Sequence, residues 1–355
     1  WPDGGEGGAA GLVDGMGQGP HKRGKAVAGE TVALGRLEPC ATGATLAGEK
    51  GAAKQLGVLE RPPAVYSLAV AAKERKDEVK LTGALHKVME EDPSLSLEQD
   101  AETHQMVLHG QGEMHLRVAL ERLTGNYGIA IESSKPQVGY LETIRKGIPQ
   151  RGRHKKQSGG HGQFGDVVLD IKPLPRGAGF EFTQTIHGGS VPRQFHSSVE
   201  AGVRDYLSAG PLGFPVVDVA VTLTDGSYHS VDSSDMAFRA AARLAMSEGM
   251  ANCQPVLLEP IMNVQIHVPS DATSRVNAIV SSRRGQILGF DARAGWPGWD
   301  TVEANMPAAE MDNLIVELRS ATAGVGAYTF SFDHLAELTG KLADQVLAAS
   351  KAEAA

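Results

Sequence analysis

The sequence predicts an α+β protein built from several domains. A chain of 355 residues is longer than one typical domain, and its length suggests roughly two to three. The order strand, helix, strand, strand, helix, strand occurs twice, and this order is that of a split βαβ unit. Between the two copies, β-prone runs alternate with helical runs and Gly-rich loops. We therefore expect two similar modules that flank a different middle domain.

The chain opens with a Gly-rich segment up to Gly19, which is typical of a loop or a disordered start. From Lys25 to Leu59, short apolar runs alternate with Gly-rich turns, which predicts part of a small β domain. Arg61-Pro62-Pro63 then indicates a linker. The first residue is Trp1 rather than Met, which favours a fragment of a longer protein.

The first split βαβ unit follows the linker. Its expected elements are a strand at 66–70, a helix at 76–91, a hairpin of 95–98 with 105–108, a helix at 113–123 and a strand at 127–132. In the first helix, Val79, Leu85, Val88 and Met89 recur near helical spacing. In the second helix, Leu116, Leu120 and Leu123 follow i, i+4, i+7 and are expected to face the sheet.

The middle domain and the second split βαβ unit are expected from the same patterns. The middle domain should contain strands at 164–171, 180–186 and 216–224 and helices at 197–209 and 235–248, with Ser233 and Ser234 as N-cap candidates. The second unit should contain strands at 261–268, 287–291, 301–306 and 328–332 and helices from about 270 to 284 and at 311–320. An amphipathic helix is expected at 335–351.

A basic run lies just before the first strand of the middle domain. Six Lys or Arg and no Asp or Glu occur from Arg145 to Lys156, in a chain of formal net charge -8. We interpret 151–165 as a flexible, exposed element suited to phosphate groups. These phosphates could belong to a nucleotide or to RNA, and a merely solvated hairpin loop is a third reading.

The segment Gly160–Gly165 spells GxGxxG, but its context argues against a nucleotide site. A polar cationic run precedes the motif and a β-prone run follows it, whereas a dinucleotide site needs a strand before and a helix after. The Walker A pattern fails too, because Asp166 and Val167 stand where Lys and Ser or Thr are needed.

Other classes of protein fit the composition poorly. No apolar run is long enough to span a membrane, and no signal peptide is recognised. Cys40 and Cys253 form no CxxC pair, so a disulfide framework or zinc site is not expected and a cytoplasmic location fits. His104, His109 and His115 lack accompanying thiolates, and no metal site is expected. The acidic total argues against a protein that coats nucleic acid.

Several stretches in fixed order resemble the carboxy-terminal half of elongation factor G, the translational GTPase that moves transfer RNA and messenger RNA through the ribosome. The resemblance covers about residues 60 to 335. The stretches that carry it are 91–95, 109–116, 135–144, 157–165, 209–213, 226–234, 255–262 and 282–285.

The resemblance implies a domain division and a fold for each part. Residues 1–62 would be the remnant of the second, β-barrel domain, 63–137 the ferredoxin-like third domain, 138–258 the fourth domain, 259–334 the ferredoxin-like fifth domain and 335–355 a C-terminal helix. The fourth domain would resemble the second domain of a small-subunit ribosomal protein. No GxxxxGK(S/T) motif occurs in the sequence, so the GTPase domain is expected to be absent from it.

The resemblance also implies partners and contact residues. The partners would be the ribosome, through its 16S and 23S ribosomal RNA, together with transfer RNA, messenger RNA and the GTPase domain of the intact protein, with no membrane. No cofactor is expected in this chain, whereas GTP and magnesium are expected in the parent protein. The residues expected to contact RNA or the ribosome are Arg153, Lys155, Lys156, Ser158, Gly159, Gly160, His161, Gln163, Arg193, His229, Arg283 and Arg284, and His115 is expected to face the GTPase domain.

Simpler roles stay open for some of these residues. His229 could be a turn histidine satisfied by its own loop, and Arg283 and Arg284 could be a charge pair at a helix end. The sequence also departs from the family, which usually has Arg where His161 stands and Tyr where Phe164 stands. We therefore weigh three functions: a translocation factor, a divergent paralogue acting in ribosome recycling or protection, and a nucleotide-dependent enzyme.

Overall fold

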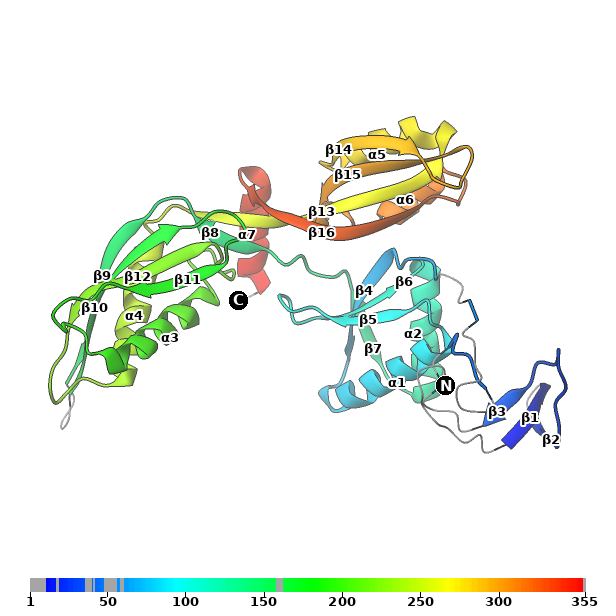
Figure 1. Cartoon of the computed structure of the whole chain (residues 1–355), viewed down its shortest axis with the longest axis horizontal. Coiled ribbons are helices and arrows are strands. Elements are labelled where there is room, and N and C mark those ends of the chain that lie inside the picture. Colours follow the sequence, from blue (N-terminus) through cyan, green and yellow to red (C-terminus); the bar gives the residue numbers. More distant parts are fainter. Residues whose placement is uncertain are drawn as a thin grey trace. The chain divides into compact units, whose positions relative to one another are not determined.

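The computed structural model describes residues 11–16, 19–35, 40, 42–47, 56–57, 61–157 and 162–353 (Figure 1). The chain divides into two compact units, one of Trp1–Asp100 with His104–Pro136 and the other of Ala101–Thr103 with Gln137–Ala355. The elements of each unit form the predicted α+β architecture of several sheets with helices.

A small antiparallel sheet begins the first unit. Its strands are β1 (Gly11–Met16), β2 (Gly19–Arg23) and β3 (Ala33–Gly35), in the order β2-β1-β3. The predicted loop-like opening is thus wrong from residue 11 onward. Glycine composition favours turns, but Leu12 and Val13 pair with both neighbouring strands, and this pairing is a long-range property. The last apolar run expected in the small β domain, 56–59, lies partly outside the described residues.

The first split βαβ domain has the predicted order of elements. They are β4 (Tyr66–Ala72), α1 (Glu78–Glu91) after a 3-10 turn, β5 (Ser96–Gln99), β6 (Met106–Gly110), α2 (Glu113–Tyr127) and β7 (Ile131–Ser134). The sheet is antiparallel in the order β5-β6-β4-β7, and both helices contribute to one core with residues such as Leu85, Leu108, Leu116 and Leu123.

Two details of this domain differ from the sequence prediction. The second helix continues to Tyr127, which was expected to start a strand, because Gly128 ends the helix in the left-handed conformation at φ 63°. Val79 is exposed, since it lies in the first turn of α1, away from the sheet-facing row of Leu81, Leu85 and Val88.

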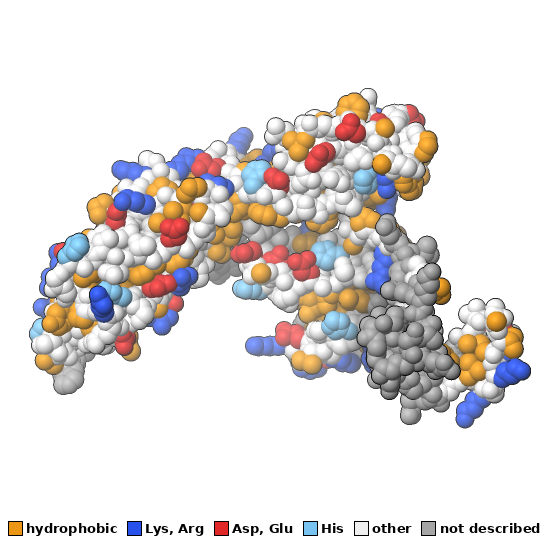
Figure 2. All heavy atoms as spheres, viewed as in Figure 1, with side chains coloured by type: hydrophobic (Ala, Val, Ile, Leu, Met, Phe, Trp, Pro, Cys, Tyr) orange, Lys and Arg blue, Asp and Glu red, His pale blue; other side chains and the backbone are white. Residues whose placement is uncertain are grey.

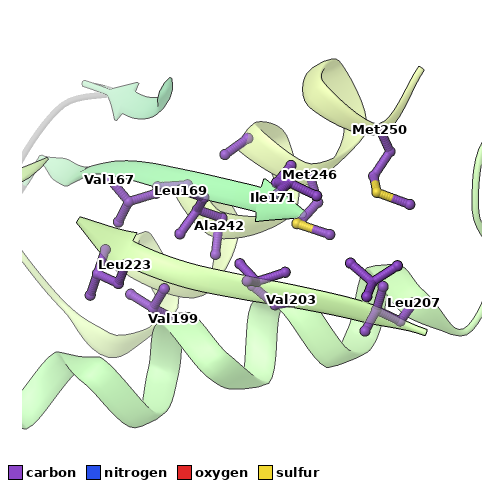
Figure 3. Close-up of a cluster of buried hydrophobic side chains, with 14 of the residues drawn as sticks. Val167, Leu169, Ile171, Val199, Val203, Leu207, Leu223, Ala242, Met246 and Met250 are labelled. Atoms are coloured by element: carbon purple, nitrogen blue, oxygen red, sulfur yellow. The ribbon is translucent and has the colours of Figure 1, made fainter. Parts of the chain in front are cut away.

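The middle domain is a four-stranded sheet with both helices in one core. Its elements are β9 (Ile148–Lys156), β10 (Gln163–Pro173), β11 (Phe180–Gln184), α3 (His196–Leu207), β12 (Val219–Ser227) and α4 (Asp235–Met250), and the sheet order is β11-β12-β10-β9. Alternate residues of β10 and β12 point toward the helices and meet Val199 and Val203 of α3 and Met246 of α4 (Figure 3).

The basic run is a strand, which corrects its interpretation as a flexible element. Residues Ile148–Lys156 pair continuously with Ile171–Gln163 of β10. Gly152 makes this packing possible, because a Cβ at this position would overlap backbone atoms of Ala241 and Ala245 in α4. Only the segment between Lys156 and Gln163 connects the two strands.

The second split βαβ domain repeats the topology of the first. Its elements are β13 (Pro255–Pro269), α5 (Thr273–Ser282), β14 (Gln286–Ala292), β15 (Trp299–Pro307), α6 (Leu314–Ala321) and β16 (Ala327–Leu338), in the sheet order β14-β15-β13-β16. A further strand, β8 (Leu141–Ile144), pairs with the start of β13. This strand was not predicted from the sequence pattern.

The C-terminal helix starts later than predicted. Residues Leu335–Leu338 continue β16 and pair with Pro260–Leu257 of β13, so the helix α7 covers Lys341–Glu353. Gly340, at φ 68°, separates the strand from the helix. None of the described helices has the length and apolarity needed to cross a membrane.

Candidate nucleic-acid interface

Three loops of the middle domain meet at one end of its sheet, which we call the tip. The tip comprises 153–157, 162–164, 187–193 and 228–234. Phe164 forms an isolated parallel bridge with Ser233, which joins the β9–β10 hairpin to the 228–234 loop. Val191 lies against Gly226 beside the backbone of Asp166, which joins the 187–193 loop to the same end. The described parts of these segments thus lie together.

The first cation of the basic strand, Arg151, is exposed but is paired with an acidic residue of the same domain. Arg151 donates hydrogen bonds to both carboxylate oxygens of Asp166, from Nε at 2.8 Å and from Nη2. Burial opposes ionisation of Asp166, but the hydrogen bonds from Arg151 and Ser227 outweigh burial and lower the pKa of this carboxyl. Arg151 therefore stabilises the strand pair β9–β10.

The remaining cations of the basic strand are exposed and form no ion pair with a described residue. Because Gly152 faces α4, the alternation of a strand places Arg153 and Lys155 on the open face of the sheet, away from the helices. The guanidinium of Arg153 lies 5.4 Å from the centroid of the Phe164 ring, a cation–π contact. Lys155 and Lys156 form no ion pair with any described residue. Figure 2 shows Lys and Arg side chains in blue over the middle domain, interspersed with acidic ones.

The loop that carries His229 is braced against the hairpin. The backbone N–H of Phe164 donates to the carbonyl of Asp232 at 2.8 Å, and the hydroxyl of Ser233 donates to the carbonyl of Phe164 at 2.9 Å. The side chain of His229 is 54% exposed, and its ring centroid lies 6.3 Å from that of Phe164. His229 is therefore an accessible imidazole on a turn that hydrogen bonds hold against the hairpin.

The 187–193 loop leaves Arg193 exposed. Gly188 and Gly189 both have φ near +70°, a conformation that side chains rarely adopt, and the loop is then anchored by the buried Val191. His196 Nε2 lies 3.0 Å from the carbonyl of Val191, which ties the loop to the start of α3.

Gln163, at the start of β10, bonds to His154 through its side-chain oxygen at 2.9 Å. Four predicted contact residues, Ser158, Gly159, Gly160 and His161, lie outside the described residues.

The predicted contact residues outside the middle domain are held by neighbouring groups. His115 accepts the backbone N–H of Gln111 at Nδ1 over 3.0 Å, and its Nε2 lies 2.8 Å from Asp92. Burial raises the pKa of Asp92, but hydrogen bonds from Ser94 and His115 lower it overall. The His115 ring therefore links the start of α2 to the end of α1.

Arg283 and Arg284, after α5, are both engaged in intramolecular bonds. Arg284 forms a bidentate pair with Glu259 at 2.8 and 2.9 Å and a further bond to Glu310 at 2.8 Å. These hydrogen bonds, led by the one to Glu259, raise the pKa of Arg284. Arg283 donates to the carbonyls of Glu310 and Asp312 at 2.6 and 2.7 Å. Arg284 thus links β13 to the turn before α6, and Arg283 links the end of α5 to the same turn.

Asp232 is a residue of the site that was missed from the sequence. It contacts both the hairpin and His229, and the signal that could have found it is an Asp in a turn rich in Gly and Ser, where such a side chain often bonds to the backbone.

Among the described residues, no group of three or more His, Cys, Asp or Glu side chains is arranged to hold a metal ion.

Comparison with known protein families gives three consecutive matches. The family described as elongation factor G, domain III, matches residues 61–135, domain IV of the same factor matches 136–254, and the elongation factor G C-terminus matches 256–346. All three matches fall in the order expected from the resemblance.

The chain is also similar to relatives named elongation factor G or elongation factor G-like, and to a solved structure. The chain is 58% identical over 318 residues to an elongation factor G-like protein of Synechocystis sp. (strain ATCC 27184 / PCC 6803 / Kazusa), covering 90% of this chain and 47% of that protein. It is 44% identical over 322 residues to elongation factor G of Aquifex pyrophilus, covering 90% and 45%. A crystal structure of a Thermus thermophilus protein superposes with a TM-score of 0.79 at 38% identity, covering 95% of this chain and 50% of the other. The chain therefore spans about half the length of the relatives it matches.

Proposed function

Since the chain belongs to the elongation factor G family over residues 61–346, we propose that it is the ribosome-binding part of a translational GTPase that promotes translocation of transfer RNA and messenger RNA. The GTP and magnesium of such a factor would be bound outside this chain. The 16S and 23S ribosomal RNAs, transfer RNA and messenger RNA are the proposed partners.

The arrangement of the tip is the observation that supports this proposal most. Exposed cations from β9, the accessible ring of His229 and the exposed Arg193 gather at one end of the middle domain. Long cationic side chains contact phosphates, and an imidazole can bond to a base edge or a 2′-hydroxyl. The Arg151–Asp166 pair stiffens the strand that carries these groups, so fewer degrees of freedom are lost on binding.

The interface at the tip is tested with Lys155→Ala and Lys156→Ala together in the full-length factor. Each lost phosphate contact should reduce the magnitude of the slope of log affinity against log salt concentration by about 1. For ribosome binding by the double variant, this slope should therefore fall in magnitude by about 2, and translocation should be slower. Lys172→Ala is the matched control, because Lys172 lies at the opposite end of β10. An unchanged slope and an unchanged translocation rate in the double variant would refute the proposal.

A second function, that of a specialised paralogue acting in ribosome recycling or protection, is favoured by one observation. The chain is more similar to the elongation factor G-like protein, at 58% identity, than to the elongation factor G of Aquifex pyrophilus, at 44%. Genetic replacement of the main elongation factor of the cell discriminates between the two functions. A translocation factor should restore growth, whereas a specialised paralogue should not.

A further inference from the structure

Asp232 connects two of the segments that form the tip, 162–164 and 228–234. Its Oδ1 accepts the backbone N–H of Gly162 at 3.0 Å, and its backbone carbonyl accepts the N–H of Phe164 at 2.8 Å. Its own N–H lies 3.2 Å from Nδ1 of His229, and its Oδ2 lies 3.3 Å from the same nitrogen. One residue therefore contacts the end of the hairpin and the imidazole through both its backbone and its side chain.

The hydrogen bonds around His229 determine where its ring proton lies. Two backbone N–H groups donate to Nδ1, that of Val231 at 3.4 Å and that of Asp232 at 3.2 Å, and they outnumber the single acceptor near this nitrogen, the Asp232 Oδ2 at 3.3 Å. A neutral imidazole whose Nδ1 is an acceptor carries its proton on Nε2. Among the described residues, Nε2 of His229 has no hydrogen-bond partner, so its N–H group is available to a ligand.

The fit between Asp232 and the hairpin is close. A Cβ on Gly162 would stand 2.9 to 3.1 Å from the Asp232 carboxylate, so a residue larger than glycine would push the carboxylate away. Ser233 also links the turn to the hairpin. Its hydroxyl donates to the Phe164 carbonyl and accepts the N–H of His229 at 2.9 Å. The turn from His229 to Ser233 is thus fixed to the hairpin at several points.

The charge of Asp232 argues against direct contact with RNA. A carboxylate repels phosphate, and this one contacts the hairpin that carries the exposed cations, where it lowers the local positive potential. Any contribution of Asp232 to RNA binding must therefore come from orienting neighbouring groups rather than from attracting RNA. We propose that Asp232 is a positioning residue, which holds the His229 ring in the Nε2–H form as a directed hydrogen-bond donor toward RNA; the RNA target rests on the function proposed above.

The positioning role is tested first without a ribosome. Long-range 1H–15N correlation spectra of the 355-residue chain with labelled histidine, at a pH where the ring is neutral, report which nitrogen carries the proton. A His229→Gln variant assigns the signal among the 12 histidines. We expect Nε2–H alone in the native chain. Asp232→Ala should give a mixture of both forms, because the turn loses its bond to Gly162 and the backbone N–H groups are no longer held in line with Nδ1. Asp232→Asn should keep the native pattern, since its side-chain oxygen still accepts from Gly162.

Asp235→Ala is the matched control for charge. Asp235 begins α4 three residues further on, and its carboxylate accepts the Ser198 hydroxyl at 2.6 Å, with no contact to His229. Its removal adds the same net charge and should leave the tautomer unchanged. Protonated Nδ1 in the native chain, or the same tautomer in Asp232→Ala as in the native chain, would overturn the proposal.

Ribosome assays in the full-length factor then test the coupling. If Asp232 acts through His229, Asp232→Ala and His229→Ala should each slow translocation by roughly tenfold, and the double variant should be no slower than His229→Ala alone. Additive effects would contradict action through His229. If Asp232→Ala changes the tautomer but His229→Ala leaves the translocation rate unchanged, the RNA target is refuted and the positioning role stands.

Discussion

Glu142 is a fully buried carboxyl group in β8, and replacing it with Gln should change how the stability of the chain depends on pH. Its Oε2 accepts the N–H of Leu212 at 2.7 Å, while its Oε1 has no partner among the described residues and faces the Cα of Gly210. Burial raises the pKa of Glu142 to about 7, and the single hydrogen bond from Leu212 offsets only part of this effect.

The sign of the effect follows from proton uptake. Between the ordinary value of 4.5 and about 7, the folded chain holds a proton on Glu142 that the unfolded chain has released. The free energy of unfolding therefore falls as pH rises through this window and levels off above it. A shift of this size corresponds to roughly 3 kcal/mol, since one pKa unit is about 1.4 kcal/mol. A glutamine side chain cannot ionise, so the Glu142→Gln variant should lack this component.

Hydrogen exchange measured by mass spectrometry on peptides of α4, after correction for intrinsic exchange rates, gives the opening free energy of the middle domain at each pH. Relative to the native chain, Glu142→Gln should gain up to roughly 3 kcal/mol between about pH 5 and pH 8. Glu181→Gln, which replaces an exposed carboxylate on β11, is the control and should show no such gain. A difference between Glu142→Gln and the native chain that is constant over this range would refute the argument.

Three further substitutions test the packing. Gly202→Ala should destabilise the middle domain by about 1 to 3 kcal/mol, because the new Cβ would overlap the backbone of α4; unchanged urea unfolding would contradict this close approach. Gly83→Ala should stabilise α1 by about 1 kcal/mol, since open space surrounds this position, and a lower unfolding midpoint would count against it. Arg284→Met should cost about 2 kcal/mol in urea unfolding, because Glu259 stays buried without its cation; an unchanged midpoint would show that this pair contributes little.

The sequence predicted the order of elements well where apolar periodicity was strong. Both split βαβ domains have the expected sequence of strands and helices, and Leu116 and Leu123 face the core as their spacing predicts. The end of α2 was placed too early, although Gly128 is a typical helix-ending residue. Boundaries of this kind depend on local capping geometry, which competes with strand propensity in the same few residues.

The basic strand shows why other features could not be predicted. Charged residues and Gly152 gave 148–156 no alternating apolar pattern, so the run resembled a loop. Its strand conformation depends on pairing with β10 and on the approach of α4 to Gly152, and both are contacts between distant segments. The same holds for β8, which pairs with β13 at residues far along the chain.

The sequence by itself determined the family, the repeated βαββαβ order and the concentration of cations in one stretch, because each is a property of residues in their linear order. Tertiary structure alone decided which cations stay available. In the basic stretch, Arg151 is bound to Asp166 whereas Lys155 and Lys156 form no ion pair with a described residue, and outside it Arg284 is held by Glu259 and Glu310. The reason is that ion pairing and the tautomer of His229 depend on distances of a few ångströms between segments far apart in the chain, and a linear pattern does not contain those distances.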